Sequence, residues 1–241
     1  FPTLAAMALD PRVFQGTSIW LKPLKFELAL AIYAGTLALY ALWVSPRVRS
    51  ALWFRTVTAT ATLAILAEIA WIGGAAAAGT ASHFNLSSPL MATLYNAAGI
   101  GAVTLTSLTL VFGVAIARND ATGLPPALHL SLCVGLVLTF VLTLVTAGTM
   151  ASMSDHSVGA SSSDAGLAFF GWSREAGDLR VAHFFATHAL HAVPLIGLLA
   201  AALLDGRAGR LVVWAGAAAY TAFVLFTFMQ ALAGRPFISA F

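Results

Sequence analysis

Charged side chains are scarce in this sequence: Asp, Glu, Lys and Arg make up only 9% of its 241 residues. A soluble domain carries about 25%. The scarcity is accompanied by 60% hydrophobic residues and a mean hydropathy of +0.90. One small soluble domain has too little interior to bury so much apolar surface. The composition therefore excludes a soluble fold and indicates an integral membrane protein.

Cysteine is almost absent too. Cys133 is the single cysteine and lies inside an apolar run, so one chain can form neither a disulfide framework nor a thiolate metal site. Iron–sulfur clusters, which are held by cysteine thiolates, are disfavoured for the same reason. The net charge is only +3 and the basic residues are spread over short loops, which argues against a nucleic-acid partner. The sequence also lacks the G-x-S-x-G, Walker and H-E-x-x-H patterns, so it identifies no catalytic residue and leaves enzymatic activity open.

Long apolar runs without strand-like alternation dominate what is present. A helix needs about 20 mostly apolar residues to cross the hydrocarbon core, and such runs favour helices over a barrel. We therefore predict an all-α integral membrane helical bundle in the lipid bilayer, with at least six transmembrane helices and a single domain. The domain is predicted over 1–241, with spans at roughly 26–44, 51–75, 90–117, 127–150, 180–204 and 210–233. The opening letters FPTLAAMAL look like the end of an earlier apolar segment, which leaves open whether a helix or signal peptide precedes residue 1.

The distribution of arginine predicts the orientation in the membrane. Three short loops carry six arginines: Arg47, Arg49, Arg55, Arg118, Arg207 and Arg210. The basic residues of the opposite side are spread over longer segments and are accompanied by acids. Because cytoplasmic loops are enriched in Lys and Arg, we expect the short loops in the cytoplasm of a bacterial inner membrane. The long loop 151–179 is then periplasmic.

Histidine is the residue type that most needs an explanation. The stretch RVAHFFATHALHAVP, residues 180–194, carries His183, His188 and His191 inside an otherwise apolar span. At 100° per residue, a continuous helix places His188 about 140° and His191 about 80° from His183, so all three can face the bundle. His188 and His191, three residues apart, are expected to be neighbours and can share one metal ion.

Further polar residues are expected on the same, outer side of the membrane. His83 and His156 fall in predicted outer loops, and Glu68 lies in the outer half of an apolar span. Imidazole and carboxylate together suit iron, copper or zinc. The predicted metal ligands are His183, His188, His191, His83, His156 and Glu68. The alternative for each is a single hydrogen bond to a neighbouring helix, worth about 0.6 kcal/mol on average.

Four other residues are candidates for contacts to a cofactor. Lys22, Lys25 and Arg235 can form a cationic rim for an anionic group, such as a haem propionate or a lipid head group. Gln230 adds a long polar group that points into the bundle. Two alternatives stay open: the lysines can extend to the head groups with Glu27 as a compensating charge, and QALAGRPF can be an ordinary helix end closed by Gly and Pro.

Several strings occur together in the chain: WLKPLKF, ASHFN, DHSVG, GWSREAGDLRVAHFFATHALHAVP and QALAGRPF. As a set, they resemble an uncharacterised family of bacterial multi-pass membrane proteins, and the resemblance covers most of the chain. It implies a class of protein and no activity.

The leading functional hypothesis is a histidine-rich site near the periplasmic face that holds haem b or a transition metal. Such a site serves electron transport or the oxidation of an apolar substrate. One alternative is a proton-coupled transporter or channel that uses Glu68 and the histidines as a relay, which requires a polar path to the inner side. The sequence offers little there beyond His129 and several threonines. The other alternative is an accessory subunit of a larger membrane complex, with other membrane subunits as partners.

Overall fold

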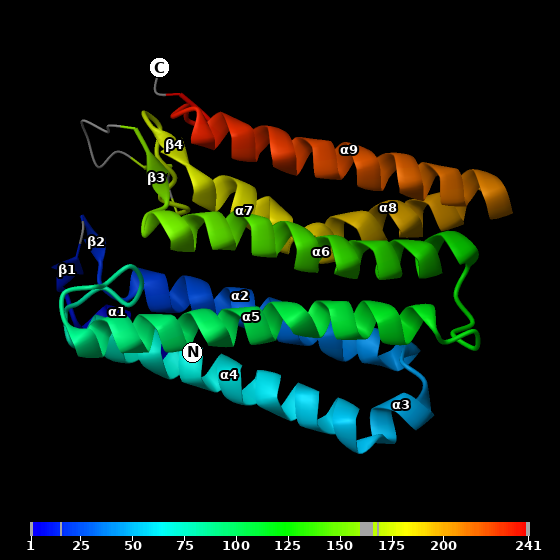
Figure 1. Cartoon of the computed structure of the whole chain (residues 1–241), viewed down its shortest axis with the longest axis horizontal. Coiled ribbons are helices and arrows are strands. Elements are labelled where there is room, and N and C mark those ends of the chain that lie inside the picture. Colours follow the sequence, from blue (N-terminus) through cyan, green and yellow to red (C-terminus); the bar gives the residue numbers. More distant parts are fainter. Residues whose placement is uncertain (1, 15, 160–165, 168, 240–241) are drawn as a thin grey trace. The chain divides into compact units, whose positions relative to one another are not determined.

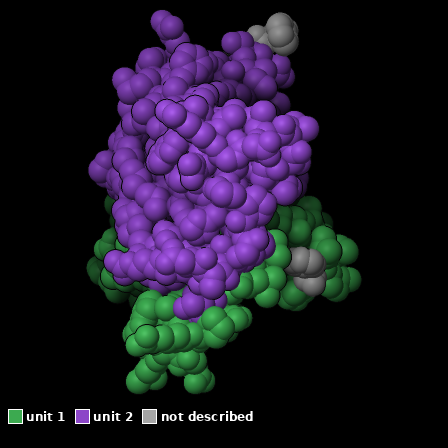
Figure 2. Space-filling model, turned by 90° about the vertical axis from the view of Figure 1, so that its right-hand side faces the viewer, with its two compact units in different colours: residues 1–42, 46–108 green, residues 43–45, 109–241 purple. Residues whose placement is uncertain are grey.

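The structure is a computed structural model that describes residues 2–14, 16–159, 166–167 and 169–239. Figure 2 colours two compact units of the chain. Unit 1 comprises Phe1–Leu42 and Pro46–Leu108, and unit 2 comprises Trp43–Ser45 and Thr109–Phe241. The single domain expected over 1–241 stays a prediction. Part of the predicted outer loop, residues 160–165 and 168, lies outside the described residues.

Long apolar helices confirm the all-α membrane bundle (Figure 1). Among the described residues, five stretches are long and apolar enough to cross a membrane, and a bent pair of helices makes a sixth if it counts as one span. The chain is therefore a multi-pass membrane protein by length and composition. The five stretches are Leu21–Trp43, Leu52–Ala77, Pro89–Ala117, Pro126–Met153 and Gly206–Leu232, and the bent pair is Leu179–Thr187 with Ala189–Leu203.

Unit 1 contains two short helices, a two-stranded hairpin, two long helices and the first part of a third. Helix α2 packs against α1 and α4, and the Tyr33 hydroxyl of α2 donates a hydrogen bond of 2.6 Å to the Leu105 carbonyl of α5. The strands are antiparallel, with Val13 opposite Ser18. The elements are α1 (Pro2–Leu9), β1 (Val13–Phe14), β2 (Thr17–Ser18), α2 (Leu21–Tyr40), α3 (Pro46–Ser50), α4 (Leu52–Ala77) and the first part of α5 (Pro89–Ala117); the 3₁₀ turn η1 (Ala41–Trp43) follows α2 and ends in unit 2.

Unit 2 is built around helix α6, which packs against α7, α8 and α9. The strands β3 and β4 pair antiparallel, with Ser157 opposite Asp178, and β4 lies beside the end of α9 (Figure 1). The elements after α5 are α6 (Pro126–Met153), β3 (Ser157–Val158), β4 (Gly177–Asp178), α7 (Leu179–Thr187), α8 (Ala189–Leu203) and α9 (Gly206–Leu232).

Proline and glycine place several helix ends. Helices α3, α5 and α6 begin at Pro46, Pro89 and Pro126, where a missing N–H costs nothing because the first helical N–H groups have no partner within the helix. Gly79 and Gly234 follow α4 and α9 with φ of +72° and +73°, a backbone conformation that glycine adopts without strain. Gly79 and Pro89 thus bound the loop that carries His83.

Two details of the helices differ from the expectation. Helix α2 begins at Leu21 rather than near residue 26, so Lys22 and Lys25 lie in its first two turns and not ahead of it. Pro23 is compatible with a helix that begins at Leu21, because proline fits the first turn of a helix. The span expected at 180–204 is broken at His188, where α7 and α8 meet at 48°. The prediction that the three histidines are regularly spaced around one continuous helix was therefore wrong.

Candidate functional site

His188 and His191 form a close pair at the break between α7 and α8. The two Nδ1 atoms are 3.1 Å apart, and the ring centroids are 5.1 Å apart. The backbone supports this turn, because the N–H groups of His191 and Ala192 both donate to the His188 carbonyl at 3.0 Å. Their expected proximity at a spacing of three residues is thus confirmed. Both side chains are half-buried.

An aromatic cluster lines one side of this pair. The Phe184 ring lies 4.3 Å from the His188 ring between centroids, and Phe184 in turn contacts Trp172 and Phe170. Phe185 joins the cluster next to Phe184. The rings restrict the orientation of His188 and give the pair apolar surroundings in unit 2.

His183 is separated from the pair by the helix break and points to α6. Its Nδ1 lies 3.2 Å from the Thr146 hydroxyl oxygen. That hydroxyl donates its hydrogen to the Leu142 carbonyl at 2.9 Å, so the hydroxyl oxygen accepts from a protonated Nδ1 of His183. The neutral imidazole then keeps its lone pair on Nε2. This tautomer is the one with which a histidine ligates metal through Nε2 while its other ring nitrogen is held by a hydrogen bond.

His156 is tied to the start of α7 by its backbone. Its carbonyl accepts a hydrogen bond of 2.8 Å from the Leu179 N–H, and its Nδ1 lies 3.4 Å from an Asp155 carboxylate oxygen. The imidazole thus has an acid beside it in the sequence. The strand pair β3–β4 explains why a residue 27 positions before His183 lies at the same end of unit 2.

A buried ion pair caps α7. The Asp178 carboxylate is 1% exposed; it accepts hydrogen bonds from the Arg180 guanidinium, at 2.6 Å, and from the Ser173 N–H, at 3.0 Å. Burial by itself raises the pKa of Asp178, but the Arg180 hydrogen bond and charge outweigh it, so the pKa lies below its usual range. The carboxylate also accepts from the Arg180 N–H as the N-cap of α7.

The expected cofactor contacts Gln230 and Arg235 lie at the end of α9. The Gln230 side-chain amide donates to the Pro236 carbonyl at 2.9 Å, and the Arg235 N–H donates to the Gln230 carbonyl at 3.1 Å. Gly234 turns the chain between them with positive φ. This geometry fits the ordinary helix end that was the alternative, and the cationic rim stays a prediction.

Glu68 is a buried carboxylate of unit 1. It is 7% exposed, and a Cβ added to Gly101 would lie 3.1 Å from its Oε1, so the carboxylate lies against the backbone of α5. Lys22 lies within electrostatic range of it. Among the residues that the structure describes, no hydrogen bond to the Glu68 carboxylate is found.

His83 occupies an aromatic setting in the loop after α4. Its ring centroid is 5.6 Å from that of Phe26 and 6.3 Å from that of Tyr95, and its Nδ1 lies 3.1 Å from the Ser82 hydroxyl. Burial, and next the charge of Lys22, lowers the pKa of His83 to about 3. The imidazole is therefore neutral at physiological pH, as a metal ligand must be.

Unit 1 thus holds Glu68, Lys22 and His83, while unit 2 holds the four other histidine candidates: His156 beside the start of α7, His183 in α7, and His188 and His191 at the break between α7 and α8. Lys25 lies one turn after Lys22 on α2. Within 2–14, 16–159, 166–167 and 169–239, no group of three His, Cys, Asp or Glu side chains is arranged to hold a metal ion. The six predicted ligands therefore do not gather as one complete coordination sphere inside either unit.

Two buried polar interactions were not predicted from the sequence. The Thr3 hydroxyl donates to Oε1 of Glu27, which is 8% exposed, so this acid is buried in unit 1. The second is the Asp178–Arg180 pair. The signal for it was present, since an Asp directly before a helix and an Arg two residues later is typical of an N-cap with a paired cation.

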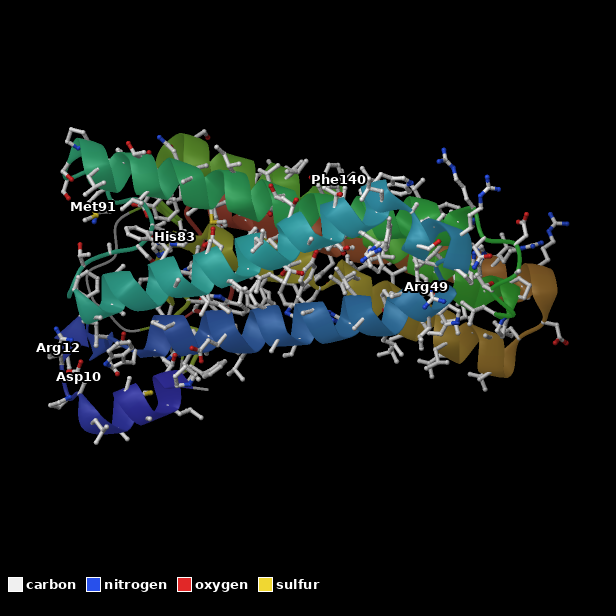
Figure 3. The ribbon with its side chains drawn as sticks, turned by 90° about the horizontal axis from the view of Figure 1, so that it is seen from below. Asp10, Arg12, Arg49, His83, Met91 and Phe140 are labelled. Atoms are coloured by element: carbon white, nitrogen blue, oxygen red, sulfur yellow. The ribbon has the colours of Figure 1, made fainter. Side chains whose placement is uncertain are left out.

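Asp10 and Arg12 form an exposed ion pair beside the β1–β2 hairpin, with 2.7 Å between a guanidinium nitrogen and a carboxylate oxygen. Figure 3 shows this pair and His83 at one end of unit 1 and Arg49 at the other. Hydrogen bonds from Arg12 and then Trp20 hold the pKa of Asp10 well below its usual range. The end of unit 1 that carries His83 therefore also carries the acid Asp10, whereas no Asp or Glu occurs in residues 28–67 around Arg49.

Comparisons of the chain with protein-family models, with curated proteins and with solved structures gave no match. The candidate functions therefore depend on the residues and geometry described above.

Proposed function

We propose that this multi-pass membrane protein binds one first-row transition-metal ion at His188 and His191, and that the ion serves electron transfer or the oxidation of an apolar substrate. The observation that carries the proposal is the distance of 3.1 Å between the two Nδ1 atoms. At metal–nitrogen bonds of about 2.0–2.1 Å, two neighbouring ligands are about 2.9 Å apart at an octahedral ion and about 3.3 Å apart at a tetrahedral one. The pair lies between these values.

The protonation states of the pair follow from the same contact. Without a metal, one Nδ1–H must donate to the other Nδ1, because two lone pairs at this distance repel each other. With a metal bound, both Nδ1 lone pairs point to the ion and both rings carry their hydrogen on Nε2. Binding therefore releases no proton from a neutral pair.

The remaining coordination positions need ligands from outside the pair. Water or substrate can occupy them, as in catalytic sites with open positions. The aromatic neighbours Phe184, Phe170 and Trp172 make the approach to the pair apolar, which favours an apolar substrate. Iron or copper fits this role because they change oxidation state and zinc does not. Haem b is the alternative cofactor in this proposal; the imidazole of His188 or His191 would hold its iron, which would carry the electrons.

The metal content of matched histidine variants tests the proposal. His188→Ala and His191→Ala are each expected to reduce the bound metal or haem at least tenfold relative to the unaltered chain. His129→Ala is the control, because the His129 Nε2–H donates to the Ile116 carbonyl at 3.0 Å and holds α6 against α5. If all three variants keep the same metal content, or lose it only together with folded protein, the pair is not a metal site.

Glu68 supports a second candidate, a proton relay in unit 1. A buried carboxylate with no hydrogen bond among the described residues is costly unless it takes up a proton or a charged partner. Lys22 and His83 lie in the same unit, and the charge of Lys22 acts on the Glu68 carboxylate and, separately, on the His83 imidazole. Glu68→Gln keeps the shape and removes the charge. A relay predicts that proton uptake by vesicles containing the protein stops while the folded yield stays constant, and unchanged uptake contradicts it.

A further inference from the structure

The end of unit 1 that carries Arg49 has positive charges and no acid. Arg47 and Arg49 lie in the last turn of α3, and Arg55 lies in the first turn of α4. All three are exposed, and between Glu27 and Glu68 the sequence contains no Asp or Glu. Among the described residues, none of the three forms an ion pair. The positive charge is thus available to a partner outside the chain.

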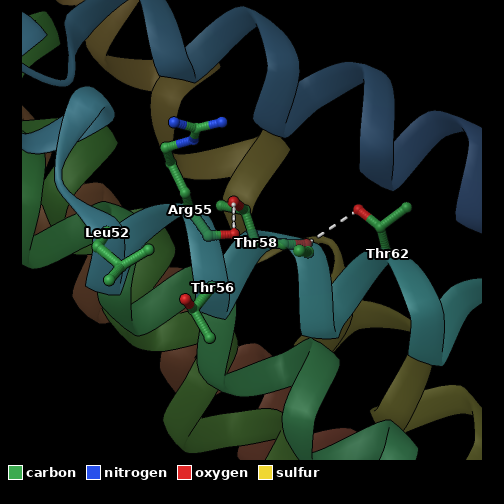
Figure 4. A pocket seen from close by; sticks show the side chains of 6 residues that line it. Leu52, Arg55, Thr56, Thr58 and Thr62 are labelled. Atoms are coloured by element: carbon green, nitrogen blue, oxygen red, sulfur yellow. Dashed lines mark hydrogen bonds between the residues drawn. The ribbon is translucent and has the colours of Figure 1, made fainter.

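A shallow groove that includes Arg55 follows α4 from Leu52 to Thr62 (Figure 4). Its volume is about 550 Å³. At 100° per residue, the lining positions fall within about 160° of the helix circumference, so they form one face of α4. At 1.5 Å per residue, the face extends about 15 Å along the helix, half of a hydrocarbon core of about 30 Å. The lining residues are Leu52, Arg55, Thr56, Thr58, Ala59 and Thr62.

The wall of the groove beyond Arg55 is less polar than its residue types indicate. The Thr58 hydroxyl donates to the carbonyls of Phe54, at 2.9 Å, and Arg55, at 3.0 Å. The Thr62 hydroxyl donates to the Thr58 carbonyl at 2.9 Å. Both hydroxyl hydrogens are therefore used within α4. At Thr58, Ala59 and Thr62, the groove therefore offers methyl groups and backbone that is already hydrogen-bonded.

We propose that this groove binds an anionic phospholipid from the leaflet that faces the arginine-rich loops. The phosphate lies on Arg55, with Arg47 and Arg49 adding attraction, and one acyl chain lies along Thr58, Ala59 and Thr62. A guanidinium matches a phosphate with two parallel hydrogen bonds, and basic residues next to membrane helices recognise anionic lipid heads.

Both halves of the groove are needed to select this occupant. A soluble phosphate needs only the arginine and gains nothing from the wall beyond it, which extends about 10 Å at 1.5 Å per residue. A lipid with a neutral head group gains from the wall but not from three exposed guanidinium groups. The combination fits an anionic phospholipid, and it uses none of the residues of the proposed metal site.

Native mass spectrometry of the full chain with a defined lipid mixture tests the proposal. The protein is released from micelles that contain equal amounts of phosphatidylglycerol and phosphatidylcholine with identical acyl chains. The unaltered chain is expected to retain phosphatidylglycerol preferentially. Arg55→Gln should reduce this retention about fivefold, the equivalent of about 1 kcal/mol for one cation near an anionic head group.

Matched variants separate the groove from general charge attraction. Arg210→Gln removes an exposed arginine at the start of α9 and should leave retention unchanged. Ala59→Phe fills the groove without a change of charge and should reduce retention at least fivefold, with Ala59→Leu as a milder form if folding suffers. Thr58→Val should bind like the unaltered chain, because the lost hydroxyl hydrogen is used within α4.

Three results would overturn the proposal. Equal losses for Arg55→Gln and Arg210→Gln indicate general electrostatic attraction. Full retention by both Ala59 variants shows that the acyl chain does not use the groove. Displacement of the lipid by millimolar glycerol phosphate shows a site for a soluble anion instead of a phospholipid.

Discussion

The neutral His83 makes the stability of unit 1 sensitive to acid, and His83→Phe should remove that sensitivity. Its pKa lies at about 3 in the folded protein, against an ordinary value of 6.5. Between pH 6.5 and about 3, His83 binds a proton in the unfolded state but not in the folded state. The stabilisation is therefore complete above pH 6.5 and is lost as the pH falls toward about 3. Phenylalanine keeps the ring contacts with Phe26 and Tyr95 and cannot titrate.

The magnitude follows from the difference between the two pKa values. A shift from 6.5 to about 3 corresponds to an upper limit of about 5 kcal/mol, at 1.36 kcal/mol for each pH unit. His83 keeps part of its surface exposed, so solvent screening lowers the effect, and we expect a loss of about 2 kcal/mol between pH 7 and pH 4. For a chain of this size, about 2 kcal/mol lowers the unfolding temperature by about 5 °C.

Thermal unfolding in detergent, followed by near-ultraviolet circular dichroism at pH 7, 6, 5 and 4, measures this loss. From pH 7 to pH 4, the unfolding temperature of His83→Phe should fall by about 5 °C less than that of the unaltered chain. His156→Asn, which removes a partly exposed histidine, is the control and should not flatten the curve. Parallel curves for the unaltered chain and His83→Phe would refute the reasoning, as would an NMR titration that places the His83 pKa near 6.5.

Two further predictions concern unit 2. Asp178→Asn leaves the Arg180 guanidinium without its buried countercharge and should destabilise the protein by about 2 kcal/mol at pH 7; because the pKa of Asp178 is lowered in the folded state, the difference from the unaltered chain should shrink below about pH 4 as the carboxylate takes up a proton. Gly177→Ala should cost about 3 kcal/mol, because its Cβ would lie 2.0 Å from the Ala231 carbonyl oxygen. Gly148→Ala is the control, since a Cβ there meets nothing within 4 Å, and it should be neutral or stabilising in chemical unfolding measurements.

Apolar runs were sufficient to predict the helices, because crossing a bilayer requires a length and a composition that the sequence displays directly. The start of α2 was less predictable. Charged residues such as Lys22 and Lys25 mark the end of an apolar run, but a helix continues through them when its backbone hydrogen bonds continue. The prediction located the apolar core of the span and not its first turns.

The break at His188 had no clear local signal. Pro194 is the only proline nearby and lies six residues later, inside α8. The bend of 48° changes which residues share a face, so His183 turns to Thr146 while His188 and His191 stay together. The spacing of three residues predicted the pair because that relation is local to one helical turn. The contact of His183 with α6 depends on packing between distant segments, which a single sequence does not reveal.

The metal content of the unaltered chain is the most direct test of the central claim. The full protein is purified in mild detergent without chelator, and its iron, copper and zinc are measured by elemental analysis beside an absorption spectrum with and without reductant. We expect close to one iron or copper ion per chain, and a Soret band that shifts on reduction if the iron is in haem. Well-folded protein with less than about one tenth of an ion per chain and no Soret band would contradict a metal site at His188 and His191.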